Sequence, residues 1–374
     1  MHVTGYTRVV NPAVQEEIVM IIHLSKDATS EQKQTVINKI ESLGLGYHIS
    51  HGTTGIDVLG IMGDTSSIEE GFFQEYEGVD KVIRISRPYK LVSREFSPEP
   101  KIIKMGDISI GGGCDVVIMA GPCALENEKQ VLTIAQYVHE LGIPVMRGGA
   151  YKPRTSPYSY QGMGLIGLNL LVKAREKYGL KIITEATGQH HHICDDGSKE
   201  KNTVLENVIA YSDIIQIGAR NMKSYGLLQE LAILTRENQK PILLKRGEAS
   251  TIKDFLLAAE YIVANGNPNV ILCLRGIRTF EEEKFQRYTP DIGAIAVLKR
   301  ESNLPVFFDP SHSCGYRSNV YRISMAAIAA GADGLIIETH NDPANALCDG
   351  EQCVSRDQLK KIKDDAAALR ALLG

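Results

Sequence analysis

The sequence predicts an α/β protein in which a closed (β/α)8 barrel, a TIM barrel, follows a small βαββαβ domain. Two observations carry this prediction. Eight short apolar runs alternate with helical patterns over the last two-thirds of the chain, and an earlier segment reads as strand, helix, strand, strand, weak helix and strand. The chain has 374 residues, which leaves room for a second small domain because such a barrel takes about 250 residues.

The smaller domain lies in the first part of the chain. We expect a loose extension at residues 1–16, the βαββαβ domain at 17–86 and a linker at 87–101, where three prolines and mixed charges predict little burial. Thr29 with Gln32 is a capping-box signal for the first helix. The predicted buried face of this helix consists of Val36, Ile37, Ile40 and Leu43. The order of elements is that of a ferredoxin-like fold.

The barrel is predicted over residues 102–374, beginning with a hairpin, KIIKMGDISIGG, that would plug its bottom. Its eight strands are expected in VVIMAGPC, VMRGGA, KIITEAT, IIQIGAR, PILLKRG, VILCLRG, PVFFDPSH and GLIIETH. Gly142, Gly179 and Gly331 follow helical patterns, where a helix end needs a left-handed residue. An open doubly wound sheet would also alternate. Only a barrel explains a reactive side chain after every strand, since barrel active sites form at the C-terminal strand ends.

Composition excludes several classes of protein. The 41 basic and 45 acidic residues give a formal net charge of −4, so the chain lacks the basic field that nucleic-acid binding needs. No apolar run is long enough to predict a membrane span, and no signal-peptide pattern is evident, so we expect a cytoplasmic enzyme. The seven cysteines have no regular spacing, which favours reduced thiols over a disulfide framework.

Basic side chains gather after the predicted strands. They are Arg147, Lys152, Arg154, Arg220, Lys245, Arg246, Arg275 and Arg278. Guanidinium and ammonium groups bind phosphate and carboxylate strongly, and Arg can do so with two parallel hydrogen bonds. The set therefore predicts anionic ligands.

A second set of side chains predicts a metal site. Its members are Cys123, His312, Glu338 and Asp349, which follow the first, seventh and eighth predicted strands. The first and eighth strands are neighbours in a closed barrel, so these groups should meet. Thiolate, imidazole and carboxylate together favour Mn2+, Fe2+, Co2+ or Zn2+ over Mg2+.

The two sets together suggest a chemistry. A metal ion could polarise an aldehyde oxygen for attack by a carbon nucleophile. Lys152 could then donate a proton to that oxygen, and Glu185 could orient or deprotonate a water. The expected catalytic residues are Lys152, Glu185, Cys123 and His312.

Several motifs are similar to those of a known family. They are AGPCALE at 120–126, RGGAYKPRTSPYSYQG at 147–162, IIQIGARN at 214–221, LLKRG at 243–247, LRGIRTFE at 274–281 and DPSHSCG at 309–315. Together with the linker RPYKLVSREF, they resemble 3-deoxy-D-arabino-heptulosonate 7-phosphate (DAHP) synthases of type Iβ, which carry an N-terminal ferredoxin-like regulatory domain. The resemblance covers about residues 17–374. It implies a metal-dependent transferase at the entry to the shikimate pathway, which condenses phosphoenolpyruvate with erythrose 4-phosphate and releases phosphate.

Carried over by position, the resemblance implies roles for individual residues. The metal ligands would be Cys123, His312, Glu338 and Asp349. Phosphoenolpyruvate would bind Arg147, Lys152, Ala219, Arg220, Lys245 and Arg275. The phosphate of erythrose 4-phosphate would bind Arg154, Thr155 and Ser156. His48 and Ser50 match positions that bind an inhibiting aromatic amino acid, tyrosine or phenylalanine, and a homotetramer is expected.

Two other functions stay open. The related synthase that makes a 3-deoxy-manno-octulosonate phosphate from arabinose 5-phosphate carries a KANRS-like segment where this chain has KPRTS, so Pro153 and Thr155 argue against it. A non-catalytic amino-acid sensor would be favoured by the loss of a metal ligand, and none is lost. The polar segment GQHHHICDDGSKEKN departs from the family and is expected to be a solvated insert. Cys314, Cys348 and Cys353 are expected to be bystanders of the metal site.

Overall fold

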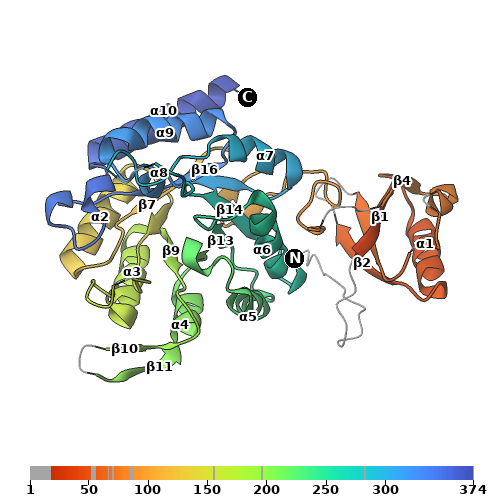
Figure 1. Ribbon diagram of the computed structural model, residues 1–374, viewed down its shortest axis with the longest axis horizontal. Helices are drawn as coiled ribbons and strands as arrows, with labels where there is room; N and C mark the ends of the chain where they lie inside the picture. The colour runs from red at the N-terminus through yellow and green to blue at the C-terminus, as the bar shows by residue number, and fades with distance from the viewer. Residues whose placement is uncertain are drawn as a thin grey trace. The chain divides into compact units, whose positions relative to one another are not determined.

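The structure is a computed structural model with two compact units (Figure 1). One contains Met1–Pro100 with Glu301–Asn303, and the other contains Lys101–Arg300 with Leu304–Gly374. The described residues are 18–51, 56–65, 67–69, 71–84, 88–154, 156–194, 197–281 and 284–373. The predicted extension at residues 1–16 lies outside them.

The N-terminal unit is a four-stranded antiparallel sheet with one long helix, in the strand order β2-β3-β1-β4. Its elements are β1 (Ile18–Leu24), α1 (Ser30–Ser42), β2 (Gly46–His51), β3 (Asp57–Met62), η1 (Phe72–Glu75) and β4 (Val79–Arg84). This is the predicted ferredoxin-like fold. The expected weak second helix is a single 3-10 turn, η1.

Helix α1 begins as the sequence predicts. Thr29 and Gln32 form a reciprocal capping box, in which each side chain accepts a hydrogen bond from the other residue's backbone N–H. The predicted buried residues Val36, Ile37 and Ile40 pack against the sheet. The prediction for Leu43 is wrong. Leu43 is the C-cap residue of α1 and is 40% exposed, because the helix ends before the residue can complete the apolar face.

The opposite face of this sheet contains a second apolar cluster, in which Ile21, Val58 and Met62 pack with Phe96 of the following segment. Strand β2 is an edge strand, and its His48 and Ser50 lie opposite Gly60 and Val58 of β3. Residues directly opposite on paired strands point to the same face. His48 and Ser50 therefore lie on the face away from α1, where the His48 ring is 6.0 Å from that of Phe96.

The C-terminal unit is a closed parallel barrel, in the order β12-β13-β14-β15-β16-β7-β8-β9. Its strands are β7 (Val117–Gly121), β8 (Val145–Arg147), β9 (Lys181–Glu185), β12 (Ile214–Ile217), β13 (Ile242–Lys245), β14 (Val270–Leu274), β15 (Val306–Phe308) and β16 (Gly334–Glu338). All eight predicted apolar runs form these strands. The barrel prediction is confirmed over the open-sheet alternative.

Helices cover the outside of the barrel (Figure 1). They are α2 (Glu128–Glu140), α3 (Gly164–Tyr178), α4 (Val204–Tyr211), α5 (Tyr225–Thr235), α6 (Ile252–Ala264), α7 (Gly293–Glu301), α9 (Arg317–Ala329) and α10 (Arg356–Leu373). Gly142, Gly179 and Gly331 have the predicted left-handed backbone after α2, α3 and α9. Within the described part of the chain, every helix is too short or too polar to span a bilayer.

A hairpin of β5 (Ile103–Met105) and β6 (Ile108–Ile110) precedes the barrel. Ile103 and Ile110 belong to the same buried cluster as Val117, Val145 and Phe307, which lie near the beginnings of their strands. The hairpin therefore closes the N-terminal end of the barrel, as predicted. The opposite end, where the strands finish, is left for the functional side chains.

Some elements were not predicted. They are the one-turn helix α8 (Pro310–Cys314), the hairpin β10 (His191–Ile193) with β11 (Lys199–Thr203), and the 3-10 turns η2 (Ala219–Asn221), η3 (Pro343–Asn345) and η4 (Gly350–Gln352). Each falls in a segment after a barrel strand, where no hydrophobic period guides the prediction.

Candidate active site

Closure of the barrel brings two of the predicted metal ligands together. β16 pairs with β7 in parallel, and Glu338, the last residue of β16, lies opposite Gly121 at the end of β7. Cys123 follows two residues later. A Cβ on Gly121 would lie 1.9 Å from the carbonyl oxygen of Arg147, so glycine is required where β7 turns past β8.

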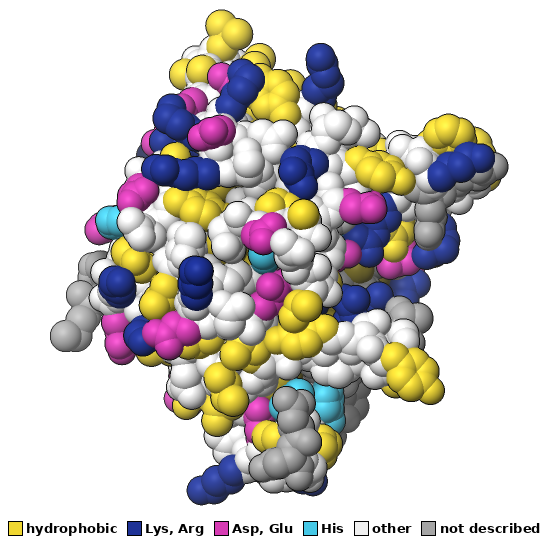
Figure 2. All heavy atoms as spheres, turned by 90° about the vertical axis from the view of Figure 1, so that its left-hand side faces the viewer, with side chains coloured by type: hydrophobic (Ala, Val, Ile, Leu, Met, Phe, Trp, Pro, Cys, Tyr) yellow, Lys and Arg dark blue, Asp and Glu magenta, His cyan; other side chains and the backbone are white. Residues whose placement is uncertain are grey.

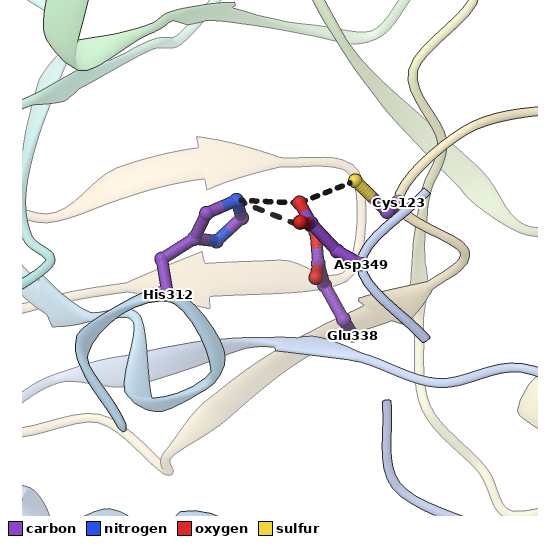
Figure 3. Close-up of side chains that lie close together, drawn as sticks. All are labelled: Cys123, His312, Glu338 and Asp349. Carbon is purple, nitrogen blue, oxygen red and sulfur yellow. Dashed lines mark hydrogen bonds and ion pairs between the residues drawn. The ribbon is translucent and has the colours of Figure 1, made fainter. Parts of the chain in front are cut away.

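The four predicted ligands form one cluster (Figure 3). Their ligand atoms all lie within 4.8 Å of one another. Cys123 Sγ is 3.2 Å from Asp349 Oδ2, and His312 Nε2 is 3.5 Å from Glu338 Oε1 and 3.9 Å from Asp349 Oδ2. Atoms bound to one ion at about 2.0–2.3 Å are about 3–4.5 Å from each other. One thiol, one imidazole and two carboxylates therefore have the chemistry and nearly the spacing of a four-ligand metal site.

Glu338 is held from both sides. Arg147 Nη1 donates a hydrogen bond to its Oε1, and Gln352 Nε2 donates one to its Oε2. Burial alone would raise the pKa of Glu338, but the charges of His312 and Arg147 outweigh it and the pKa is lowered. The carboxylate is therefore kept ionised in an almost fully buried position, where it is 1% exposed.

Asp349 is also positioned by its neighbours. Its backbone has a φ of 53°, a left-handed conformation that Asp tolerates better than most residues. Arg287 Nη1 donates to Asp349 Oδ1 at 3.1 Å, which leaves Oδ2 directed at Cys123 and His312. Burial acts to raise the pKa of Asp349, but the charges of His312 and Arg287 outweigh this effect, and the pKa is lowered.

Asp309 orients the histidine. Its carboxylate accepts hydrogen bonds from His312 Nδ1 at 2.7 Å and from the His312 backbone N–H at 2.9 Å. Lys245 Nζ pairs with the same carboxylate. Although burial acts to raise it, the pKa of Asp309 lies well below its usual value because His312 and Lys245 are close. With the proton held on Nδ1, Nε2 is the nitrogen that faces the cluster, as a carboxylate–histidine pair provides at many metal sites.

Cys123 has two close partners. Lys152 Nζ lies 3.1 Å from Cys123 Sγ and donates to the Cys123 carbonyl oxygen at 3.0 Å. Cys348 Sγ lies 3.1 Å from Cys123 Sγ and accepts from Arg154 Nη1 at 2.8 Å. The hydrogen bond to Cys348 and burial raise the pKa of Cys123, against the effect of Lys152. A cation in addition to Lys152, such as a bound metal ion, would then be needed to favour the thiolate of Cys123.

Cys348, which was expected to be a bystander, lies in direct contact with the predicted ligand Cys123. The loop before η4 folds back over the end of β7, so a residue 225 positions away contacts the thiol of Cys123. Cys314 and Cys353 are buried. Burial raises the pKa of Cys314 to about 12 and also raises that of Cys353, so both stay protonated near neutral pH.

A cavity at the C-terminal ends of the strands contains most of the predicted substrate-binding residues. Its lining includes Arg147, Lys152, Arg154, Glu185, Ala219, Arg220, Lys245, Arg275, His312 and Asp349. Ser156 lies outside this lining, and its Oγ accepts a hydrogen bond from the backbone of Tyr158 at 3.3 Å. Thr155 is not among the described residues.

Two guanidinium groups of the cavity have buried nitrogens without a hydrogen-bond partner. Arg147 Nε and Arg275 Nη1 are buried without a hydrogen-bond partner, in residues that are 4% and 5% exposed. The Arg275 guanidinium stacks 3.8 Å above the ring of Tyr288, whose hydroxyl donates to Glu248 at 2.8 Å. An unpaired buried cationic donor is costly. These two groups therefore fit an anionic ligand that would complete their bonding.

Glu185 faces the same cavity from the end of β9. Gln216 Nε2 donates to Glu185 Oε2 at 2.9 Å, which fixes one oxygen. A Cβ on Gly218 would lie 2.0 Å from Glu185 Oε1, so glycine at this position makes room for the carboxylate.

Arg246 does not belong to the cavity, contrary to the expectation from sequence. Its guanidinium pairs with Asp291 at 2.7 Å and donates to the Ser250 carbonyl oxygen at 2.9 Å. Successive residues at the end of a strand point to opposite sides, so Lys245 faces the cavity and Arg246 faces away.

The sequence analysis missed several residues of the site. They are Asp309, Gln352, Arg287, Tyr288, Glu248, Gln216 and Cys348. Asp309 had a readable signal, because it precedes His312 by three residues and caps helix α8. Gln216 lies in strand β12, and Gln352 lies in the turn η4. The other residues lie in segments after barrel strands, whose paths no local pattern predicts.

Comparison with known families identifies two matches. The model described as "DAHP synthetase I family" matches residues 91–372. The model described as "DAHP synthase ferredoxin-like domain" matches residues 20–87. Together they account for both compact units.

Individual relatives agree with these matches. The chain is 45% identical over 355 residues to the phospho-2-dehydro-3-deoxyheptonate aldolase of Thermotoga maritima. This alignment covers 95% of this chain and 99% of the relative. A crystal structure of this T. maritima enzyme, a DAHP synthase, has a TM-score of 0.70 at 44% identity and covers 96% of this chain and 98% of its own. The 2-dehydro-3-deoxyphosphooctonate aldolase of Syntrophotalea carbinolica is 31% identical over 292 residues, which cover 73% of this chain and 98% of the relative.

The ligand cluster generates a first prediction. Cys123→Ala should weaken binding of Mn2+ or Co2+ by more than about a hundredfold, since the loss of a direct ligand should exceed the 10–100-fold effect of an outer hydrogen-bonding partner. Isothermal titration calorimetry measures the affinity for the metal ion. The circular dichroism spectrum should be unchanged, which would show that the variant is folded. Cys114→Ala, which removes a partly exposed free thiol, is the matched control. Equal affinities of the two variants would contradict the role of Cys123 as a ligand.

Proposed function

This chain belongs to the DAHP synthetase I family, and we propose that it condenses phosphoenolpyruvate, erythrose 4-phosphate and water to DAHP and inorganic phosphate. This reaction opens the shikimate pathway to the aromatic amino acids. The observation that carries the proposal is the cavity in which unsatisfied buried guanidinium donors lie beside the four-ligand cluster. Such a site can hold an anionic enol phosphate next to an electrophilic aldehyde.

The phosphoenolpyruvate end of the cavity is basic. We assign this substrate to Arg147, Lys152, Ala219, Arg220, Lys245 and Arg275. Phosphoenolpyruvate carries a phosphate and a carboxylate. Arg147 Nε and Arg275 Nη1, which are buried without a hydrogen-bond partner, could donate to them. Both donors come from strand ends of the rigid barrel, so little reorganisation would be needed on binding.

Cys123, His312, Glu338 and Asp349 would hold a divalent ion, and their mixed donor set fits Mn2+, Fe2+, Co2+ or Zn2+. When bound, this ion supplies Lewis-acid polarisation of the aldehyde carbonyl. Lys152 lies within hydrogen-bond distance of Cys123 Sγ. Burial acts to lower the pKa of Lys152, but a thiolate at Cys123 raises it. Its ammonium is therefore available as a proton donor beside the cluster.

The reaction assigns a role to each end of the cavity. C3 of phosphoenolpyruvate would form a bond to the aldehyde carbon, whose oxygen takes a proton from Lys152. A water would add to C2, and Glu185, fixed by Gln216, would orient it and accept its proton. The C2 hydroxyl then loses its proton and becomes the C2 carbonyl as the bond from C2 to the phosphate oxygen breaks. The departing phosphate takes up that proton and leaves toward the basic side chains.

The phosphate of the aldose is assigned to Arg154, Thr155 and Ser156. Arg154 lines the cavity and contacts Cys348 next to the metal ligands.

Relatives named 2-dehydro-3-deoxyphosphooctonate aldolase are 27–31% identical over 72–73% of this chain. The T. maritima heptonate aldolase is 45% identical over 95% of it, which favours erythrose 4-phosphate over arabinose 5-phosphate. The complete ligand set argues against a non-catalytic sensor.

A rate assay with both aldose phosphates tests the proposed reaction. The purified chain should release phosphate from phosphoenolpyruvate with erythrose 4-phosphate at least about tenfold faster than with arabinose 5-phosphate. A chelator should stop turnover, and added Mn2+, Co2+, Fe2+ or Zn2+ should restore it. A faster rate with arabinose 5-phosphate would favour the octulosonate reaction, and no turnover with either aldose would favour a sensor.

Arg154→Ala tests the division of the two phosphate sites. We expect the KM for erythrose 4-phosphate to rise about 10–100-fold, because a hydrogen bond to a charged group contributes about 1.5–3 kcal/mol. The KM for phosphoenolpyruvate should change by less than about threefold, since its assigned donors Arg147, Lys245 and Arg275 are held by other partners and do not depend on Arg154. Arg278→Ala, which removes a cation that lies outside the cavity lining and is 60% exposed, is the control. Equal effects on both KM values would mean that the division is wrong.

The ferredoxin-like domain suggests feedback regulation. We propose that an aromatic amino acid, tyrosine or phenylalanine, binds at His48 and Ser50 in a homotetramer and inhibits turnover. Support comes from the position of both side chains on one exposed-edge strand and from the family match of residues 20–87. Binding would stabilise an inhibited arrangement that is only partly populated without the ligand.

Inhibition assays test this regulatory role. The full chain should be inhibited by tyrosine or phenylalanine, whereas Ser50→Ala and a chain that starts near residue 100 should each lose at least about tenfold in sensitivity. Ser42→Ala, at the far end of helix α1, is the matched control and should be inhibited normally. Equal inhibition of the truncated and full-length chains would exclude the small domain as the sensor.

A further inference from the structure

The polar insert after β9 is a folded hairpin and not merely a solvated loop. Strands β10 and β11 pair through His191 with Thr203 and Ile193 with Lys199. His191 and His192 are only partly exposed, and the His191 ring is 2.9 Å from the Glu200 carbonyl oxygen. Histidine side chains gather at the lower end of the face in Figure 2, where Figure 1 has this hairpin. The hairpin therefore has anchoring contacts that its composition did not predict.

The carboxylate of Glu200 joins this hairpin to three other elements. Its Oε2 accepts hydrogen bonds from the Tyr151 hydroxyl at 2.7 Å and from Asn207 Nδ2 at 2.7 Å. Its Oε1 accepts from the backbone N–H of Leu165 at 2.9 Å. Tyr151 and Asn207 are both 2% exposed. One acidic side chain thus ties together the loop after β8, the start of α3 and the start of α4.

The start of α3 depends on this contact. Its N-cap residue, Met163, makes no side-chain capping bond, so the N–H of Leu165 would lack the partner that a capping residue usually provides. Glu200 supplies it, and its negative charge also suits the positive end of the helix dipole. A Cβ on Gly164 would lie 2.6 Å from Glu200 Oε1, so the glycine allows the carboxylate to approach this closely.

Tyr151 connects Glu200 to the segment that reaches the cavity. It forms an antiparallel bridge with Gly162, and Lys152 N donates to the Gln161 carbonyl oxygen at 3.0 Å. These bonds close the base of the loop between Tyr151 and Gly162. The next side chain, Lys152, reaches Cys123, and Arg154 reaches Cys348. The Tyr151 hydroxyl is therefore the fixed end of the segment that presents both cations.

We propose that Glu200 is a positioning residue that fixes Arg154 for the aldose phosphate, and Lys152 beside Cys123, by clamping the hydroxyl of Tyr151 from the β10–β11 hairpin. This inference deepens the proposed function and rests on it. The strand-end cations Arg147 and Lys245 are held by Glu338 and Asp309 instead. Of the six residues assigned to phosphoenolpyruvate, only Lys152 belongs to the clamped segment. Removal of the Glu200 carboxylate should therefore raise the KM for the aldose phosphate more than the KM for phosphoenolpyruvate.

Kinetics of four variants tests this role. In Glu200→Ala, the KM for erythrose 4-phosphate should rise at least about tenfold, because two or more hydrogen bonds to a charged group are lost, while the KM for phosphoenolpyruvate stays within about threefold. Tyr151→Phe, which removes one hydroxyl from the same network, should change the KM in the same direction by less. Glu200→Gln keeps one acceptor oxygen, which can serve either the N–H of Leu165 or the donors of Tyr151 and Asn207 but not both, and should recover part of the loss. Lys201→Ala, an exposed residue on the same strand, is the control and should match the unmodified chain.

Hydrogen exchange gives a readout that does not depend on catalysis. In Glu200→Ala, amides of the 151–165 segment should exchange at least about tenfold faster, whereas amides of β13 and β14 should be unchanged. Equal increases of both KM values, or unchanged KM values with a lower melting temperature, would show that Glu200 is only structural. If the unmodified chain makes no product, the proposed function fails, and unchanged exchange of the 151–165 segment would separately overturn the clamp.

Discussion

The pairing of β16 with β7 is the constraint on which the site depends. It closes the barrel, and it aligns Glu338 with Gly121 through a register of five residue pairs. Cys123 then lies beside Glu338 although more than 200 residues separate them in the chain. The bottom hairpin supports the same closure, because its Ile103 and Ile110 fill the interior at the other end of the strands. A barrel that did not close would scatter the four ligands over two distant edges.

Charge balance couples the metal ligands to the anion-binding residues. Buried ions are costly unless they are paired, and here Arg147 pairs with Glu338 and Lys245 pairs with Asp309. The same cations face the cavity, where donors of Arg147 and Arg275 are left without partners. A divalent ion would therefore balance the negative charge of the predicted metal ligands. An anionic substrate would balance the positive charge of the basic side chains. We expect changes to one set to alter the affinity of the other.

Sequence patterns predicted those features that follow from periodicity or from local capping. The eight strand runs, the capping box of Thr29 and the glycines that end helices all have short-range causes. Patterns failed where a loop path decides the outcome. Cys348 reaches Cys123 only because the loop before η4 folds back. The error for Arg246 has a different cause, because the alternation of neighbouring strand residues that turns it away from the cavity can be read from the sequence. The role of Glu200 could not be predicted from the polar insert around it. Its partners Tyr151 and Leu165 are distant in the sequence, and no local pattern indicates them.

The central claim is that four side chains gathered by barrel closure bind one divalent ion next to a phosphoenolpyruvate site. A crystal structure with Mn2+ and phosphoenolpyruvate, with anomalous diffraction measured at the manganese edge, tests it most directly. The account predicts one anomalous peak within about 2.5 Å of Cys123 Sγ, His312 Nε2 and an oxygen of both Glu338 and Asp349, and phosphoenolpyruvate bonded to Arg147 and Arg275. A peak at other residues, or phosphoenolpyruvate bound away from those two guanidinium groups, would contradict it.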